Sequence, residues 1–263
     1  MGVVEDCRSL ELISLHIPKS GGSALGIWLE LVYGKEAVYF DSNENPQHLG
    51  HEYHIDPESY LEKYSLGYPF LRGKKAVHGH IWTNKYRYIE NVPRITFIRD
   101  PLDRIISDYW NAKIFSEGRK NGFFDNNYPG AGLARKYRSW RRKLRVRQNP
   151  MQVYFFNNKP SILEYAHIPL KRYFYCETFF GDFGPERYDF IGDYSNFSDE
   201  MARLKNFLGV SKSYPLPQEN VTSGKADGYK QFKEGVLDDP VTMTRLKELL
   251  ADDLDFYQKH AGK

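Results

Sequence analysis

The feature that most constrains the fold is a glycine-paired loop between an apolar strand and an amphipathic helix near the start of the chain. Residues 10–31 read LELISLHIPKSGGSALGIWLEL, with an apolar run over 12–17 and apolar residues at helical spacing over 24–31. Between them lies the loop PKSGGS at 18–23. Glycines let backbone N–H groups approach a ligand closely, and the start of the following helix adds unpaired N–H groups and a positive dipole. The stretch therefore predicts an anion-binding site, to which Lys19 adds a full charge.

The loop differs from the common nucleotide-binding loop GxxxxGK[ST], in which the lysine follows the glycines and a hydroxyl residue binds magnesium. Here Lys19 precedes Gly21 and Gly22. Taken alone, the pattern is equally compatible with an ordinary strand–turn–helix corner that carries a solvated lysine. The rest of the chain has to distinguish the two interpretations.

Two further strands are predicted over residues 75–80 and 94–99, and a helix follows the second of them. Asp100 is expected to cap this helix and Pro101 to take its first position. The expected apolar face of the helix consists of Leu102, Ile105, Ile106, Tyr109 and Trp110. Strands that alternate with helices predict an α/β fold, with a parallel sheet flanked by helices in a single domain over residues 1–263.

The segments around this frame give further predictions. Residues 34–73 are polar and are predicted as loops with one short helix near 57–64. The other expected elements are short strands at 173–176 and 188–191, a helix capped by Ser198 that runs to Leu208, and one last helix over 241–257.

Three polar segments follow the three predicted strands. His16 to Ser23 follow the first strand, His78 to His80 end the second, and Arg99 ends the third. Ligands of open α/β sheets bind outside the carboxyl ends of the strands. We therefore expect these segments to converge on one crevice.

In order and kind, these segments resemble the signature segments of sulfotransferases that use PAPS, 3′-phosphoadenosine 5′-phosphosulfate, as sulfuryl donor. The segments are PKSGGS at 18–23, HGH at 78–80 and RDPLDRIIS at 99–107. The similarity is closest to the carbohydrate sulfotransferases of the heparan sulfate 2-O type. It implies a P-loop-like parallel sheet and an enzyme that moves the sulfuryl group of PAPS to a hydroxyl acceptor, with a carbohydrate as the expected acceptor.

The resemblance also implies which residues bind the nucleotide. The 5′-phosphosulfate is expected to bind to Lys19, Ser20, Gly21, Gly22 and Ser23. Arg99 and Ser107 are expected to hold the 3′-phosphate. A later loop is expected to close over the nucleotide with Thr222, Ser223 and Lys225. A nucleotide with phosphates on two carbons requires two separated anion sites, which agrees with this division.

The catalytic roles follow from the same resemblance. His80 is expected to take the proton from the acceptor hydroxyl, with His78 as a second candidate for the base or as a substrate contact. Lys19 is expected to stabilise charge on the leaving oxygen during in-line transfer, and His16 to support the loop. No carboxylate pair suggests a metal site, so no metal is expected.

Composition and patterning narrow the class of protein. The chain of 263 residues is 41% hydrophobic and 27% charged, which is typical of a soluble globular protein. No apolar run reaches the ~20 residues of a membrane helix, and Glu5, Asp6 and Arg8 stand where a signal peptide would be apolar. Cys7 and Cys176 have no metal-site or disulfide-framework spacing. We therefore expect a cytoplasmic protein without a membrane span.

The net charge of +3 conceals a basic segment. Nine basic and no acidic residues lie between 126 and 163, so the rest of the chain carries −6. The stretch from Arg135 to Arg147 is either a solvated basic face or a rim that attracts an acidic acceptor such as a uronate- or sulfate-bearing glycan. Nucleic acid is the weaker expectation, because no nucleic-acid-binding module accompanies the charge.

Two other functions remain open on the sequence. The first is an ATP-dependent small-molecule kinase, against which the missing GK[ST] argues. The second is a non-catalytic protein that binds anions or glycans through the same loop. Loss of both Lys19 and the HGH segment would indicate such a protein, and both are present.

Overall fold

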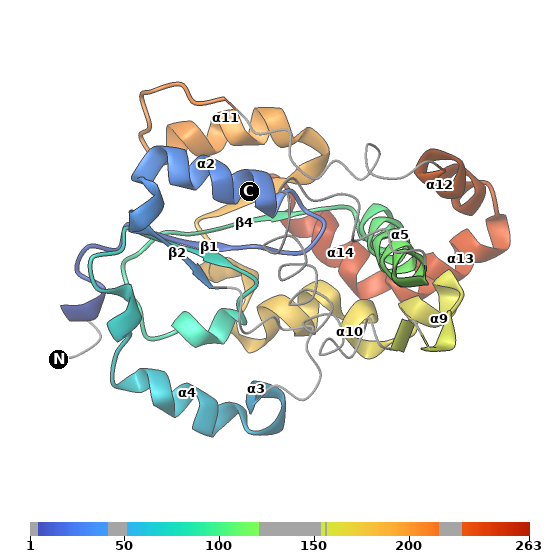
Figure 1. The fold of residues 1–263 in the computed structure, drawn as a ribbon, viewed down its shortest axis with the longest axis horizontal. Helices are drawn as coiled ribbons and strands as arrows, with labels where there is room; N and C mark the ends of the chain where they lie inside the picture. Colours follow the sequence, from blue (N-terminus) through green and yellow to red (C-terminus); the bar gives the residue numbers. More distant parts are fainter. Residues whose placement is uncertain (1–4, 42–51, 121–153, 156, 216–227) are drawn as a thin grey trace, which may run out of the picture.

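A five-stranded sheet lies at the centre of the computed structural model, which describes residues 5–41, 52–120, 154–155, 157–215 and 228–263. Helices cover both faces of the sheet, and a further group of helices lies beyond one end of the strands (Figure 1). All neighbouring strands are parallel. The predicted α/β fold class is therefore confirmed.

The strands are short, and those at the centre are buried along almost their whole length, as expected for a parallel sheet that is covered on both faces. They are β1 (Leu12–Leu15), β2 (Val38–Asp41), β3 (Ala76–Gly79), β4 (Arg94–Ile98) and β5 (Phe190–Asp193). Their order is β2-β3-β1-β4-β5, so the three strands predicted before the motifs lie next to one another. Leu15, the last residue of β1, is opposite Gly79 of β3 and Thr96 of β4. The segments that follow these strands consequently start at the same edge of the sheet.

Each face of the sheet is closed by apolar side chains of helices. Helices α2 (Gly22–Tyr33) and α11 (Phe197–Phe207) lie on one face (Figure 1). Leu29 and Leu204 of these helices are fully buried against Leu12 and its neighbours. The other face packs against the π-helical segment η4 (Phe174–Phe180) and α14 (Ala251–His260).

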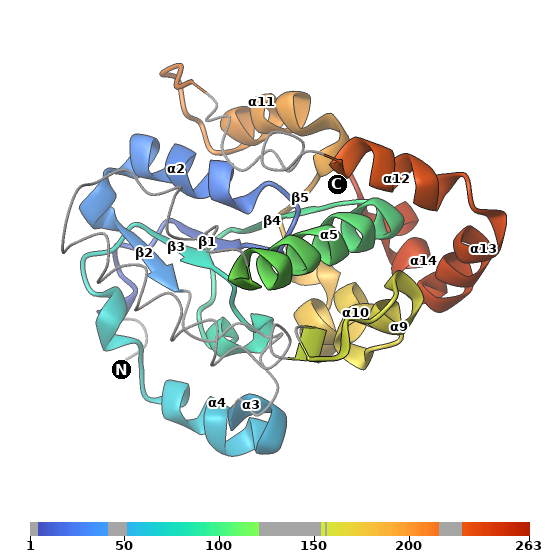
Figure 2. The same cartoon turned by 45° about the vertical axis from the view of Figure 1, so that its right-hand side comes forward.

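A second apolar core joins the helices beyond the carboxyl ends of the strands. Its helices are α5 (Pro101–Lys120), α9 (Ile162–Ala166), α12 (Tyr229–Leu237) and α13 (Pro240–Leu249). Ile105 and Ile106 of α5 are fully buried here, as the predicted apolar face requires. The Asp103 N–H donates to Asp100 Oδ1 over 3.0 Å, which confirms the predicted cap. Figure 2 shows α5 in front of the sheet, with α12 beside it.

The remaining described elements connect this frame. They are α3 (Glu52–Ile55), α4 (Pro57–Ser65), α10 (Pro169–Arg172) and the 3₁₀ turns η1 (Lys35–Ala37), η2 (Pro69–Leu71), η3 (Thr83–Tyr86), η5 (Gly181–Phe183), η6 (Pro185–Arg187) and η7 (Tyr194–Asn196). Helix α4 confirms the helix predicted near 57–64. Among the described helices, none is both long and apolar enough to cross a bilayer.

Four predictions about elements are wrong. Residues 34–73 contain the edge strand β2, whose middle residues are partly exposed and so leave no apolar run in the sequence. Residues 173–176 are not a strand, because the Asp253 carboxylate accepts hydrogen bonds from the N–H groups of Phe174 and Tyr175 and fixes the start of η4. No local pattern reveals a partner so distant in the chain.

The predicted last helix is two helices, α13 and α14, which meet at the fully buried Leu250. The apolar spacing continues across this break, so the sequence gives no sign of it. Helix α11 begins at Phe197 with Asn196 as its N-cap residue, two positions before the Ser198 cap that was predicted. Its end is as expected, because Gly209 follows with a φ of 65°.

Candidate active site

The loop between β1 and α2 presents a helix start without a side-chain cap. Its cap residue, Gly21, has a φ of 79°, and α2 begins at Gly22 with no side chain bonded to its first N–H groups. Lys19 is also left-handed, with a φ of 70°, an uncommon conformation for a residue other than glycine. The first turn of α2 thus offers N–H groups and a positive dipole end to an anion.

Packing as well as ligand access requires the two glycines. A Cβ atom on Gly22 would lie 1.8 Å from Cδ2 of the His16 ring, far inside contact distance. One on Gly21 would lie 2.8 Å from the rings of both Tyr194 and Phe197, at a φ that side chains rarely adopt. The glycine pair therefore lets the loop pass between His16 and the aromatic residues around the start of α11.

The hydroxyls of the loop lie in different surroundings. Ser20 is buried, and its hydroxyl lies beside that of Tyr175. Ser23 and Lys19 are partly exposed. The Lys19 charge reaches Asp108 of α5: burial acts to raise the pKa of Asp108, but Lys171, Arg104 and Lys19 together hold the pKa below its usual value. The loop lysine is thus electrostatically coupled to an ionised carboxylate beneath it.

Three histidines stack at the carboxyl ends of β1 and β3. The His16 ring lies 4.0 Å from the His80 ring and 5.2 Å from the His78 ring, centroid to centroid, in both cases nearly parallel. Burial and the neighbouring imidazoles hold the pKa of His16 well below its ordinary value. The stack is therefore neutral at His16 and joins the loop to the HGH segment.

Hydrogen bonds fix the tautomer of His78. Its Nε2 lies 2.9 Å from the Gly22 carbonyl oxygen, which only accepts, so Nε2 carries the proton. Its Nδ1 then accepts from Ser14 Oγ over 2.8 Å. Burial lowers the pKa of His78 to about 4, and only 2% of the residue is exposed. Both ring nitrogens of His78 are thus engaged inside the protein.

His80 has the opposite tautomer. Its Nδ1 lies 2.7 Å from the His16 carbonyl oxygen and therefore donates to it. In the neutral ring the lone pair is then on Nε2, the nitrogen that can accept a proton. His80 is only partly buried, in contrast to His78.

Arg99 connects the end of β4 to the same loop. Its Nη1 donates to the Lys19 carbonyl oxygen over 3.0 Å, and its Nη2 donates to Asp103 over 3.0 Å. The guanidinium lies over the Tyr194 ring at 4.9 Å, and the Tyr175 hydroxyl bonds to both backbone groups of Arg99. The predicted convergence of the three segments is thus confirmed by contacts: Arg99 to Lys19, His78 to Gly22 and His80 to His16.

The other predicted site residues are placed as follows. Ser107 lies two turns into α5 and is fully buried. Thr222, Ser223 and Lys225 lie outside the described residues, as does the basic stretch from Arg135 to Arg147. Among the residues that the structure does describe, no group of histidine, cysteine and carboxylate side chains could hold a metal ion.

Sequence reasoning missed two ionic clusters at the site. Asp108 accepts hydrogen bonds from Lys171 Nζ at 2.6 Å and from the Tyr165 hydroxyl at 3.0 Å, all within the buried layer under α5. Asp103 pairs with Arg99 and with Lys233 of α12. Their i, i+4 spacing could have suggested the pair of Arg99 with Asp103. The other partners are 57 or more residues away in the chain and left no sequence signal.

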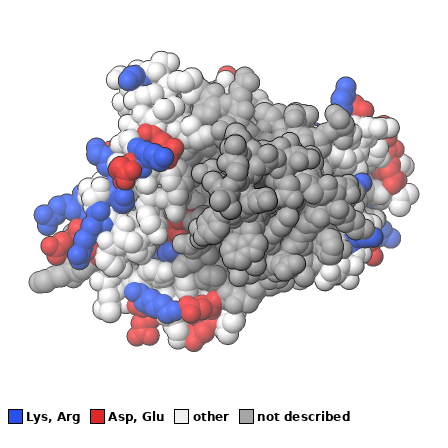
Figure 3. Space-filling view, in the orientation of Figure 1, with Lys and Arg blue, Asp and Glu red and all other residues white. Residues whose placement is uncertain are grey.

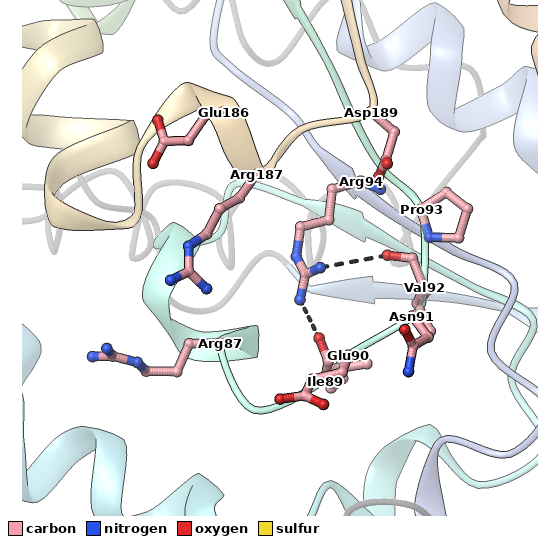
Figure 4. Close-up of a pocket in the computed structure, with 10 residues that line it drawn as sticks. All are labelled: Arg87, Ile89, Glu90, Asn91, Val92, Pro93, Arg94, Glu186, Arg187 and Asp189. Atoms are coloured by element: carbon pink, nitrogen blue, oxygen red, sulfur yellow. Dashed lines mark hydrogen bonds between the residues drawn. The ribbon is translucent and has the colours of Figure 1, made fainter.

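A separate cavity of about 690 Å³ opens beside Arg94, at the start of β4 and hence at the opposite edge of the sheet (Figure 4). The Arg94 guanidinium donates to the carbonyls of Val92 and Ile89 and so braces the chain there. On the face that Figure 3 shows, described basic and acidic side chains lie next to one another in small mixed groups. The cavity does not belong to the carboxyl-end site.

Comparison with known proteins bears on this site. Residues 6–260 match the model of a family described as the sulfotransferase family. A sulfotransferase from Alicyclobacillus acidocaldarius is 16% identical, with 95% of this chain and 98% of that one covered, at a TM-score of 0.35. Mouse sulfotransferase SULT7A1 in complex with PAP is 14% identical, with 99% and 91% covered, at a TM-score of 0.39. No curated protein matches the sequence. Because both TM-scores are low, the assignment rests on the family match.

Proposed function

Because the chain belongs to the sulfotransferase family, we propose that it transfers the sulfuryl group of PAPS to a hydroxyl acceptor at the site where the 18–23 loop, the HGH segment and Arg99 meet. The match over residues 6–260 confirms the predicted enzyme class. The donor, the residue roles and the acceptor are the content of the proposal.

The observation that carries the proposal is the hydrogen bond from Arg99 Nη1 to the Lys19 carbonyl, which ties two anion-binding features together. One is the start of α2, without a side-chain cap and with a glycine pair that leaves its N–H groups accessible. The other is the guanidinium of Arg99. The residues present thus fit a nucleotide with phosphates at the 5′ and 3′ positions, since each phosphate requires its own donors.

In this proposal the first turn of α2 and the loop from Lys19 to Ser23 bind the 5′ end, and Arg99 with Ser107 binds the 3′-phosphate. When bound, PAPS supplies the sulfuryl group and a phosphate as leaving group. Lys19 stabilises the charge that develops on the leaving oxygen, because a cation there is favoured more strongly in the transition state than in the ground state. The loop at Thr222, Ser223 and Lys225 remains the predicted cover of the nucleotide.

His80 is the base of the proposed reaction. The bond from its Nδ1 to the His16 carbonyl supports this role, because it keeps the lone pair on Nε2 and holds the ring in one orientation. His78 supports the loop instead, since its Nε2 donates to Gly22 and its Nδ1 accepts from Ser14. His80 Nε2 takes the proton of the acceptor hydroxyl as the new S–O bond forms.

The acceptor in the proposal is a carbohydrate hydroxyl. This choice rests on the resemblance of the HGH and RDPLDRIIS segments to the heparan sulfate 2-O type. Incubation with PAPS and a panel of uronate-bearing glycans, neutral oligosaccharides and tyrosine peptides would test it. Sulfation of a glycan is expected, and exclusive sulfation of a peptide tyrosine would refute the carbohydrate acceptor.

Calorimetric titration with 3′,5′-diphosphoadenosine (PAP) and, separately, with ATP and magnesium tests the donor. The proposal predicts that PAP binds and that ATP with magnesium binds at least ~100-fold more weakly, because only PAP carries the phosphate that Arg99 would hold. Preferential binding of ATP would point to a kinase and contradict the proposal. Binding of neither nucleotide would also contradict it.

A further inference from the structure

Helix α12 is fixed against α5 beside the candidate 3′-phosphate site. The Phe232 ring stacks on Tyr109 at 5.5 Å and on Trp110 at 5.0 Å, and all three belong to the second apolar core. Lys233 follows Phe232 directly. Its position relative to the first turn of α5 is therefore set by packing.

One carboxylate joins two cations at this point. Asp103 accepts a hydrogen bond from Arg99 Nη2 at its Oδ2 and an ion-paired hydrogen bond from Lys233 Nζ at its Oδ1. The Arg99 side chain is 13% exposed, Asp103 34% and Lys233 31%. The three charges thus lie at the surface of the site, where a soluble anion could reach them.

Asp103 is ionised in this arrangement. Burial would raise the pKa of Asp103, but the hydrogen bond from Lys233 and the charge of Arg99 outweigh it and hold the pKa below its usual value. The cluster therefore carries two positive charges and one negative charge. A doubly charged phosphate would complement the two cations better than the single carboxylate does.

The guanidinium of Arg99 has further capacity for an anion. Its Nε is buried and meets no acceptor in hydrogen-bond geometry among the described residues. Its Nη2 is bonded to Asp103, which lies in the first turn of α5. An arginine binds phosphate through two parallel N–H donors, so Nη2 has to leave Asp103 for such a pair to form with Nε.

We propose that Lys233 is a second cation of the 3′-phosphate site and that Asp103 is an internal competitor, which the phosphate displaces from Arg99 and Lys233. This inference rests on the proposed function. When the 3′-phosphate leaves, Asp103 pairs with Arg99 and Lys233 again. The carboxylate therefore weakens the binding of the nucleotide product and favours its release.

Titrations of PAP and of adenosine 5′-monophosphate, which lacks the 3′-phosphate, test the role of Lys233. Lys233→Met is expected to weaken PAP about five-fold, since the contact is a charged one that is partly screened by solvent. It should leave the affinity for adenosine 5′-monophosphate unchanged. Lys230→Met is the matched control, because Lys230 lies on the same helix, is 88% exposed and pairs with Glu234 instead.

Asp103→Asn tests the competitor. The amide no longer neutralises Arg99 and Lys233, so PAP is expected to bind about three-fold more tightly, again without change for adenosine 5′-monophosphate. Unchanged or weaker PAP binding by this variant would overturn the competitor role. An unchanged PAP affinity of Lys233→Met, with the Lys230→Met control, would overturn the second cation.

Arg99→Ala separates this inference from the proposed function. If Arg99→Ala weakens PAP binding and neither Lys233→Met nor Asp103→Asn alters it, the inference fails and the proposed site stands. If Arg99→Ala leaves PAP affinity unchanged, or if PAP does not bind the unmodified protein, the proposed function itself fails. Matching circular dichroism spectra of all variants would show that each one folds.

Discussion

At the scale of single residues, His80 is distinguished from its neighbours by one hydrogen bond. Its Nδ1 donates to the His16 carbonyl, so the lone pair of the neutral ring is on Nε2. His78 has the opposite tautomer, because its Nε2 donates to the Gly22 carbonyl and its Nδ1 accepts from Ser14. The two histidines of one HGH segment therefore differ in tautomer and in exposure. Residues i and i+2 of a strand lie on one face, but β3 ends at Gly79, so His80 is not held to the backbone geometry that places His78.

His80→Ala is expected to lower kcat about 100-fold, because general base catalysis contributes on that order. PAP affinity should stay within about two-fold, since the base acts on the acceptor and not on the nucleotide. Steady-state rates and a PAP titration measure both quantities. His167→Ala removes an exposed histidine of α9 and serves as the control. Wild-type turnover in His80→Ala would show that another group is the base.

The buried histidines should make stability depend on pH. The pKa of His78 is about 4 in the folded protein, below its ordinary value of 6.5, so the unfolded chain binds the proton more readily. The unfolding free energy is therefore expected to fall as pH decreases from about 6.5 to 4, by roughly 2 kcal/mol between pH 6.5 and 5 for this group. Urea unfolding at pH 7 and pH 5 measures the change.

His78→Gln isolates this contribution. Asp253 titrates in the opposite sense, because burial raises its pKa to about 6 and its stabilisation is lost as pH rises from 3.8 to 6. The variant keeps Asp253, so the difference between the two proteins reports on His78. A His78→Gln protein with the full wild-type loss between pH 7 and pH 5 would rule out the histidine as its source.

At the scale of elements, η4 positions Arg99 of the site through the hydroxyl of Tyr175. The Asp253 carboxylate of α14 accepts the N–H groups of Phe174 and Tyr175, and the Tyr175 hydroxyl in turn bonds to the backbone of Arg99. The fully buried Arg104 guanidinium lies 3.5 Å from the Phe174 ring centroid and 3.8 Å from Asp253. A chain of buried polar contacts thus runs from the last helix to the residue that would hold the 3′-phosphate.

Asp253→Ala is expected to lower the unfolding free energy by about 3 kcal/mol, because it leaves Arg104 buried without its counter-ion and two buried N–H groups without their acceptor. Asp252→Ala, at the exposed neighbouring position, should have almost no effect. Thermal and urea unfolding measure both variants. Equal stabilities of the two variants would mean that η4 does not depend on the carboxylate.

At the scale of the whole molecule, local patterns predicted the parts of the fold that are built locally. The strands β1, β3 and β4 are apolar runs, and the Asp100-Pro101 pair marks the start of α5, so each could be read from neighbouring residues. The edge strand β2 and the segment η4 could not, because partly exposed residues and a distant carboxylate decide their structure.

The same division holds for the candidate site. Parallel strands end at a common edge, so the convergence of the loop, the HGH segment and Arg99 followed from the order of the segments alone. The tautomers of His78 and His80 depend on carbonyls 56 and 64 residues away, which no spacing reveals. Asp103 with Lys233 and Asp108 with Lys171 are likewise pairs that only the packing of helices brings together.

A crystal structure of the protein with PAP would test the central claim most directly, because it locates both phosphates at once. The account predicts the 5′-phosphate at the start of α2, on the loop from Lys19 to Ser23, and the 3′-phosphate on Arg99. Electron density for the nucleotide at another place, such as the cavity beside Arg94, would contradict it. So would a 5′-phosphate at the α2 start with the 3′-phosphate directed away from Arg99.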